Sequence, residues 1–206
     1  MRSNNSFFMA SGRTKSTDFG ASLIIVLILL VIIAGIGISA VQISIMSERG
    51  ARNDRDYQIA WQASEAALMD AEYDMRGPGT ATRKDVFALN NSQDFVAGCG
   101  ITGKSKGLCT LSPSGMPTWL AVDFTSSTSP STEFGDFTSR AFDAGTAGLK
   151  PVKKPRYIIE IIQDTGTYGN AAYGADEKYT YRVTAIGFGP REDIQAVTQM
   201  LFRKQL

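Results

Sequence analysis

Histidine is absent from this chain of 206 residues, and cysteine occurs only twice. Without histidine the chain lacks the commonest general base of enzymes and the commonest protein ligand of transition metals. The net charge is +1, so no excess of one sign points to a nucleic acid or another polyanion as a partner. These absences weigh against an enzyme, and we expect no catalytic residue, no cofactor and no metal site.

Charged side chains are also absent from residues 19 to 47. Within this stretch Ala21 to Val41 is almost wholly aliphatic, and as a helix it would reach roughly 30 Å, enough to cross a bilayer. No small-residue cleavage site ends the apolar run, as one would in a secretory signal, and a second helical pattern follows directly. We therefore expect residues 21–47 to stay in the mature protein as a membrane-spanning helix.

The charges around the apolar segment do not decide its orientation. Arg2, Arg13 and Lys15 precede it, offset by Asp18, and arginines also follow it at positions 49, 52 and 55. Neither side of the segment has a clear excess of lysine and arginine, so the positive-inside rule does not predict an orientation. The polar leader before the apolar segment is short, and the two cysteines lie beyond the segment. Both features favour a leader on the cytoplasmic side of the membrane and a domain on the outer side.

A second helical pattern covers residues 48–76. Alanines at positions 60, 63, 67 and 71 recur with Leu68 at helical spacing and form a narrow apolar stripe, which another element can approach closely. Acidic residues fall mainly between the alanines, at Glu65, Asp70, Glu72 and Asp74. Gly77-Pro78-Gly79 should end this helix.

The two cysteines, Cys99 and Cys109, would form a disulfide in an oxidising compartment. Closing so short a loop would stabilise the fold by about 2–3 kcal/mol in the chain-entropy model. Two free thiols are the alternative, whereas the spacing fits no CxxC metal or redox motif. Between the cysteines, we interpret Lys104-Ser105-Lys106 as a solvated loop tip rather than as a nucleophile site.

Residues 77–155 are rich in Gly, Ser, Thr and Pro, which predicts an irregular, variable region around the cystine. One strand is expected there, from Trp119 to Phe124. Four acidic residues of this region suggest calcium, but their spacing does not reproduce an EF-hand, and we interpret them as solvated carboxylates. They are Asp123, Glu133, Asp136 and Asp143.

The C-terminal segment, residues 156–206, contains three β-branched and aromatic runs with turn-rich links: 156–163, 178–188 and 193–203. Such an order predicts an antiparallel meander, one face of which can cover the alanine stripe. The expected fold is therefore α+β: a long N-terminal helix, half in the membrane and half amphipathic, packed on an antiparallel sheet, with an irregular disulfide-bearing insertion between them.

This arrangement resembles a type IV prepilin, in which a short polar leader ends in glycine, here Gly20, before a hydrophobic helix. Several stretches are similar to the PilX-type minor pilins of type IV pilus assembly. They are Gly20 to Leu27, the charged residues 48–56, Ala60 to Glu72, Gly107-Leu108-Cys109, and Tyr181 to Gly189.

The resemblance implies a pilin-like fold and a processing route. A prepilin peptidase would cut after Gly20, removing residues 1–20 as a leader peptide, and would methylate the new amino terminus at Ala21. The protein would sit in the inner membrane with its domain in the periplasm, and after assembly at the pilus tip on the cell surface. Its partners would be other minor pilins, the major pilin and a PilY-type tip adhesin, and it would prime pilus assembly for twitching motility and adhesion.

The chain departs from the usual pilin sequence at two positions. Most pilins carry a glutamate at the fifth residue after the cut, which pairs with the amino terminus of a neighbouring subunit, and this chain has Ile25 there. A carboxylate in hydrocarbon costs several kcal/mol unless it is paired. A subunit without it suits the distal end of a pilus, where no neighbour lies above, better than a repeating position. Ala21 likewise departs from the phenylalanine that is common in major pilins.

Two alternatives remain. The tip pseudopilin of type II secretion shares the missing glutamate, but that family usually carries a larger insertion than residues 77–155 provide. A signal-anchored envelope enzyme or sensor would have to draw its catalytic groups from Asp, Glu, Lys, Ser or Tyr.

Three smaller features of the helix admit two readings each. The charged residues 48–56 are either contacts between subunits or an ordinary solvated face. Gly35 and Gly37 mark either a close-packing point or the usual tolerance of membrane helices for glycine. We expect Trp61 to pack against the sheet rather than to form a binding site.

Overall fold

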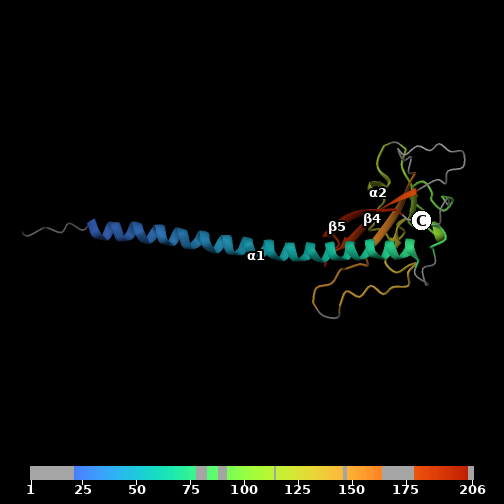
Figure 1. The fold of residues 1–206 in the computed structure, drawn as a ribbon. Helices are drawn as coiled ribbons and strands as arrows, with labels where there is room; N and C mark the ends of the chain where they lie inside the picture. The colour runs from blue at the N-terminus through green and yellow to red at the C-terminus, as the bar shows by residue number, and fades with distance from the viewer. Residues whose placement is uncertain are drawn as a thin grey trace, which may run out of the picture. The chain divides into compact units, whose positions relative to one another are not determined.

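The computed structural model describes residues 21–77, 83–87, 92–113, 115–145, 148–163 and 179–203. The chain divides into two compact units, one ending at Gly50 and the other comprising Ala51–Leu206. The elements, which Figure 1 shows, are helix α1 (Ala21–Arg76), the 3₁₀ helix η1 (Gly103–Ser105), β1 (Leu108–Thr110), α2 (Thr118–Ala121), β2 (Thr132–Glu133), β3 (Arg156–Gln163), β4 (Tyr179–Phe188) and β5 (Gln195–Arg203).

Helix α1 joins the two predicted helical segments without a break and contains no proline. It ends at the predicted place because Gly77 adopts the left-handed conformation (φ 58°), in which its N–H donates to the Tyr73 carbonyl at 2.9 Å. A β-carbon at position 77 would lie 2.4 Å from Cβ of Lys84. Glycine therefore serves both the turn and the close return of the chain.

The sheet follows the order β1-β3-β4-β5. The predicted meander is confirmed: β3 pairs antiparallel with β4 and β4 with β5, with Val183 opposite both Ile159 and Met200. Two short strands join β3 on its other side, β1 in parallel and β2 antiparallel. The sheet is thus mixed rather than wholly antiparallel. Sequence analysis missed β1 and β2 because strands of three and two residues carry too little pattern to be predicted.

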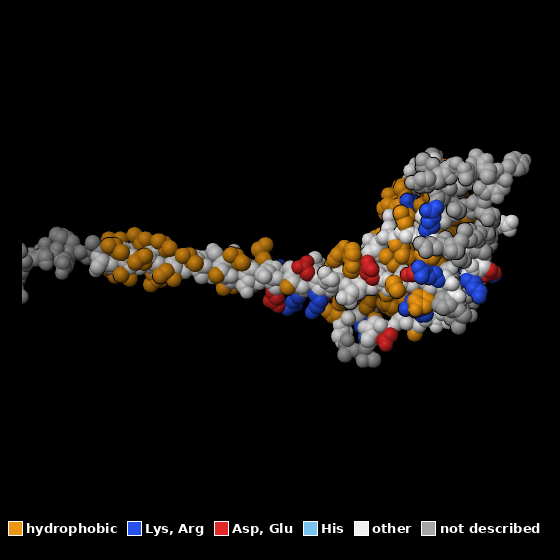
Figure 2. All heavy atoms as spheres, in the orientation of Figure 1, with side chains coloured by type: hydrophobic (Ala, Val, Ile, Leu, Met, Phe, Trp, Pro, Cys, Tyr) orange, Lys and Arg blue, Asp and Glu red, His pale blue; other side chains and the backbone are white. Residues whose placement is uncertain are grey.

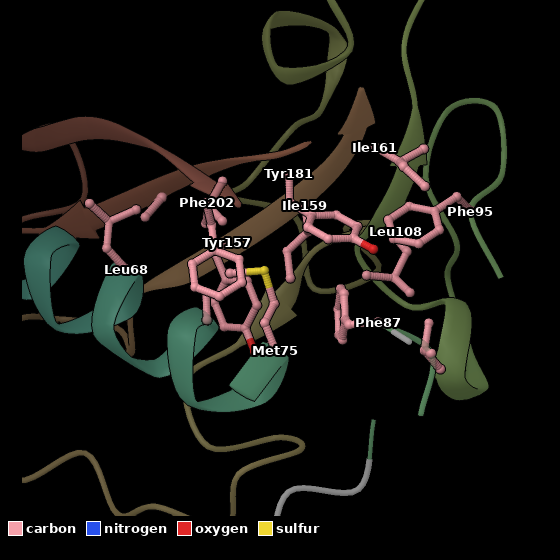
Figure 3. Close-up of a cluster of buried hydrophobic side chains, with 14 of the residues drawn as sticks. Leu68, Met75, Phe87, Phe95, Leu108, Tyr157, Ile159, Ile161, Tyr181 and Phe202 are labelled. Carbon is pink, nitrogen blue, oxygen red and sulfur yellow. The ribbon is translucent and has the colours of Figure 1, made fainter. Parts of the chain in front are cut away.

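The core of the second unit lies between α1 and one face of the sheet (Figure 3). The predicted alanine stripe is buried, with no alanine at positions 60, 63, 67 and 71 more than 3% exposed. Opposite it lie inward-facing residues of the strands, among them Tyr157, Ile159, Tyr181, Val183 and Phe202. The helix comes so close to β4 that a β-carbon on Gly187 would lie 2.0 Å from the Ala60 carbonyl oxygen.

The cystine and the segment around α2 form a second cluster with outward-facing residues of the sheet, Ile158, Ile186 and Phe188. The strand predicted from Trp119 to Phe124 is wrong, because Thr118–Ala121 forms a single helical turn directly after Pro117. That turn lets Trp119 and Val122, three residues apart, pack against the same cluster. An extended segment would point them to opposite sides.

Candidate functional site

The first half of α1 exposes its hydrophobic side chains, which Figure 2 shows along this part of the helix. Every described side chain from Ser22 to Gly50 is exposed, and the large hydrophobic ones between Leu23 and Met46 are 47–73% exposed. Helix α1 is long and apolar enough to cross a membrane by its length and composition. So large an apolar surface is stable only against lipid or against other apolar helices.

The beginning of this helix carries no carboxylate. Its first turn contains no acidic residue, Ile25 is 58% exposed, and the first acidic side chain along α1 is Glu48. Gly20 lies outside the described residues, while Ala21 is the first residue of α1. Cleavage after Gly20 and methylation at Ala21 stay predictions.

There is open space around the two glycines of the apolar half in the described part of the chain. A β-carbon on Gly35 or Gly37 would have no neighbour within 4 Å, and Ser39 Oγ donates to the Gly35 carbonyl at 3.0 Å. The fold of this chain therefore does not require glycine at either position. Both readings of this pair stay open.

The charged segment that follows is solvated. Residues 48–55 are exposed, and a contact of 3.3 Å joins Arg55 to Asp56. Trp61, further along the helix, is 43% exposed, so the prediction that it packs against the sheet is wrong. Tyr57, Met69 and Tyr73 are about as exposed as Trp61, at 42–52%. The side of α1 away from the sheet thus carries several large apolar groups.

The predicted disulfide between Cys99 and Cys109 is present. Two lysines of the enclosed loop form ion pairs with carboxylates elsewhere: Lys104 Nζ lies 2.9 Å from Asp85, and Lys106 Nζ 2.6 Å from Asp136. The hydrogen bond from Lys104 lowers the pKa of Asp85. The loop is thereby joined to segments on both sides of it in the sequence.

Two catalytic spacings occur in this loop. Residues 98–105 (GCGITGKS) match the phosphate-binding loop of nucleotide hydrolases, and residues 103–107 (GKSKG) match a hydrolase nucleophile elbow. The structural context fits neither, because both motifs need a strand before the loop and a long helix after it, and here η1 has three residues. Lys104 is paired with Asp85, and Ser105 Oγ donates to the Thr102 carbonyl at 3.1 Å. Both motifs are therefore coincidental.

A buried charge network joins α1 to the cystine loop and the sheet. Arg83 and Asp74 form an ion pair in which both side chains are fully buried, and Arg83 Nε donates to Asp74 Oδ1 at 3.0 Å. The guanidinium also donates to the carbonyls of Lys104 (3.2 Å) and Lys106 (2.6 Å). Tyr157 Oη on β3 donates to Asp74 Oδ2 at 3.0 Å, and burial raises the pKa of Tyr157 well above its usual value.

A second buried carboxylate, Asp70, lies one turn earlier on α1 and holds residues 135–140. It accepts hydrogen bonds from the Gly135 N–H (2.8 Å) and from Thr138 Oγ1 (2.6 Å), and Arg140 lies 3.4 Å away over the Tyr73 ring. Desolvation raises the pKa of Asp70 despite these three partners, which lower it. The two aspartates therefore fix the variable region to the helix.

Sequence reasoning did not identify these aspartates as buried anchors. A signal was present, because Asp70 and Asp74 continue the spacing of Ala63 and Ala67 in steps of three and four residues, and so share the stripe that faces the core. Acidic residues at such positions need partners, and the partners come from segments 9 to 83 residues away in the sequence.

The four acidic residues considered for calcium are dispersed. Asp123 and Asp143 accept hydrogen bonds from the N–H groups of nearby Thr125 and Gly145. Glu133 pairs with Lys154 and Arg156, and Asp136 with Lys106. No group of three potential metal ligands occurs among the residues that the structure describes.

A long apolar N-terminal helix that continues onto an α+β domain with a disulfide is the architecture of a pilin-like protein. Comparison with family models agrees: residues 20–68 match the PilX N-terminal domain, and residues 105–204 match the C-terminal domain of type IV pilus assembly protein PilX. Together the matches cover well over half of the chain, which belongs to the PilX family of type IV pilus assembly proteins. Comparisons with curated proteins and with solved structures give no significant match.

Membership places the chain in a structural family whose partners are other components of the pilus. The two matches leave out residues 69–104, which contain Asp70, Asp74 and Arg83. These three residues of the buried networks therefore lie between the two matched segments, whereas their partners Lys106, Thr138 and Tyr157 lie within the second.

Proposed function

We propose that this chain is a minor pilin that takes part in priming type IV pilus assembly. It sits at or near the pilus tip with other minor pilins and supports a PilY-type adhesin. The observation that carries the proposal is the uncharged, exposed first half of α1 with Ile25 in place of the usual pilin glutamate. A subunit that cannot pair with the amino terminus of a neighbour above it suits the end of a filament.

Each segment has a role in this proposal. Residues 1–20 are the prepilin leader, residues 21–47 anchor the subunit in the inner membrane and then pack in the pilus, and residues 48–76 carry the periplasmic domain. Residues 77–155 are the variable region, of which the described parts are held by Asp70, Asp74 and the cystine, and the segment 156–206 contains the three long strands β3, β4 and β5. Prepilin peptidase cuts after Gly20 and methylates Ala21.

The role is structural rather than enzymatic. Among the described residues the charged side chains of the cystine loop are used in ion pairs, and Ser105 has no histidine to act as its base, since the chain contains none. No observation favours the type II tip pseudopilin or an envelope enzyme over the assembly role. The match of both segments to a pilus assembly family supports the latter.

Mass spectrometry of the amino terminus tests processing. The protein is taken from sheared surface pili of its native host and compared with that of a strain lacking prepilin peptidase. We expect a peptide that starts at Ala21 and carries one added methyl group, absent from the peptidase mutant. An intact leader, or absence from the pilus fraction, would leave a signal-anchored envelope protein.

Genetic deletion tests priming. We expect the deletion to reduce surface pili and twitching, and a gene copy with Ile25→Leu to restore both, because leucine keeps the apolar surface. Ile25→Glu should restore them poorly, since its carboxylate would lack an amine to pair with and costs several kcal/mol in hydrocarbon. Unchanged pili and twitching after deletion would contradict the proposed role.

A further inference from the structure

Strand β5 ends the sheet, and along residues 195–202 its outer edge carries no partner among the described residues. The sheet order places β4 on one side of β5, and the described backbone hydrogen bonds of residues 195–202 go to β4 alone. Figure 1 shows β5 beside β4. Residues 195–202 therefore present backbone donors and acceptors along the outer edge, and such an edge is a ready template for another strand.

Residues 195–202 of β5 lack the features by which proteins usually protect an edge, and a charge occurs only at the last residue of the strand, Arg203. From Gln195 to Phe202 there is no charge and no proline, and the strand is longer than most edge strands. Its outward-facing positions include Val197, which is 48% exposed, and Leu201, which is 70% exposed. The residues that alternate with them, such as Ala196 and Phe202, are buried against the helix side.

The geometry specifies the kind of occupant. A ladder of unpaired backbone groups is satisfied by an extended segment, and the apolar groups at positions 197 and 201 are covered by apolar side chains at alternate positions of that segment. This is recognition by strand addition. A helix or a small ligand would leave the edge unsatisfied.

A second copy of this chain is the alternative occupant. Two β5 strands paired antiparallel would be related by a twofold axis perpendicular to the sheet, so the parts of α1 that lie against the two sheets would run in opposite directions. Ile25 suits a subunit that does not repeat, which favours a different pilus component.

We infer that β5 is a docking edge, to which an extended, alternately apolar strand of a different pilus component is added. The inference rests on the proposed role in pilus assembly and deepens it by assigning the contact to one strand of the domain. Added strand and sheet then form one continuous hydrogen-bonded layer, which joins the subunit to its partner through backbone groups and the side chains of Val197 and Leu201.

Site-specific photocrosslinking in piliated cells of the native host tests the inference. A photoreactive amino acid replaces Val197 in the full chain, and a second variant carries it at Val152, an equally exposed valine (48%) that lies outside the sheet. We expect the crosslinker at position 197 to capture another pilus component, identified by mass spectrometry, and the crosslinker at 152 to capture at least about tenfold less of it.

A double substitution, Val197→Lys with Leu201→Lys, complements the crosslinking. It places two charges on exposed positions of the edge and should lower recovery of the subunit in pili by about tenfold. The matched control, Val152→Lys with Leu120→Lys, should leave recovery unchanged, and thermal unfolding of both purified variants should match that of the unsubstituted chain.

The outcomes separate this inference from the proposed function. Crosslinking at position 197 to a second copy, or no adduct from a chain that is processed and present in pili, would overturn the docking edge and leave the minor pilin role intact. An unprocessed chain that never reaches the pilus would instead contradict the proposed function itself.

Discussion

Asp74 on α1 and Arg83, nine residues further along the chain, form an ion pair in which neither side chain is exposed to solvent. Arg83 spans from the helix to the carbonyls of the cystine loop, and Tyr157 completes the site from β3. One arginine therefore joins segments that are far apart in the sequence. A buried pair of this kind is costly to break, because the remaining charge has no compensation.

Replacing Arg83 by alanine should lower the free energy of unfolding by about 3–5 kcal/mol, because Asp74 is left buried without its cation. The control is Arg191→Ala, which removes an exposed arginine 3.3 Å from Asp193 and should cost less than about 1 kcal/mol. Thermal unfolding of the full chain in detergent, followed by near-ultraviolet circular dichroism, compares the two. Equal unfolding midpoints for the two variants would show that the buried ion pair stabilises the fold no more than the exposed pair does.

Asp70 should make stability depend on pH with a defined sign. Its pKa in the folded chain lies above the ordinary value of 3.8, so the folded form keeps a proton just above pH 3.8, where the unfolded chain has lost it. The resulting stabilisation is fully present below that interval and is lost as the pH rises through the folded pKa.

Asp70→Asn removes this pH-dependent contribution while keeping an oxygen that accepts from the Gly135 N–H. Urea unfolding of both proteins from about pH 4 to pH 7 measures it. As the pH rises, the unsubstituted chain should lose stability relative to the variant, because only the unsubstituted chain must ionise the buried carboxyl group at position 70. If the free energies of unfolding of the two proteins changed in parallel with pH, this would contradict the raised pKa of Asp70.

Gly187→Ala should destabilise the second unit by about 1–3 kcal/mol, because the new methyl group meets the backbone of α1 and forces helix and sheet apart. Gly50→Ala is the matched control: its β-carbon would meet no atom within 4 Å, and alanine favours a helix over glycine by about 1 kcal/mol. Opposite shifts of the two unfolding midpoints are expected. An unchanged unfolding midpoint for Gly187→Ala would contradict the close approach of α1 to β4.

The cystine should contribute about 2–3 kcal/mol, as for other short disulfide loops. Reductant should lower the unfolding midpoint of the unsubstituted chain to that of the variant with Cys99→Ser and Cys109→Ser. The double variant itself should not respond to reductant, which makes it the control. A midpoint insensitive to reductant in both proteins would show that the ion pairs of Lys104 and Lys106 alone hold the loop.

The parts of the fold that sequence reasoning predicts are those with long periodic patterns. Helix α1 has alanines at helical spacing and a glycine stop, and β3, β4 and β5 are each eight or more residues of β-branched and aromatic pattern. Short elements escape such reasoning, since β1, β2 and α2 owe their conformation to contacts with β3 and the cystine cluster rather than to their own sequence.

The candidate site divides in the same way. Ile25 and the cysteines are visible as single positions in the sequence, whereas the roles of Asp70 and Asp74 depend on partners supplied by distant segments. The exposure of Trp61 shows a second limit of sequence analysis. An aromatic residue on an amphipathic helix does not reveal which side of the helix the sheet covers.

Localisation of the subunit on isolated pili tests the central claim most directly. Ser127 is exposed, so Ser127→Cys provides a thiol for maleimide-linked gold, and the unsubstituted chain, whose two cysteines are joined in a disulfide, is the unlabelled control. The account predicts gold at one end of each labelled pilus in electron micrographs. Gold spaced regularly along the filament would contradict it.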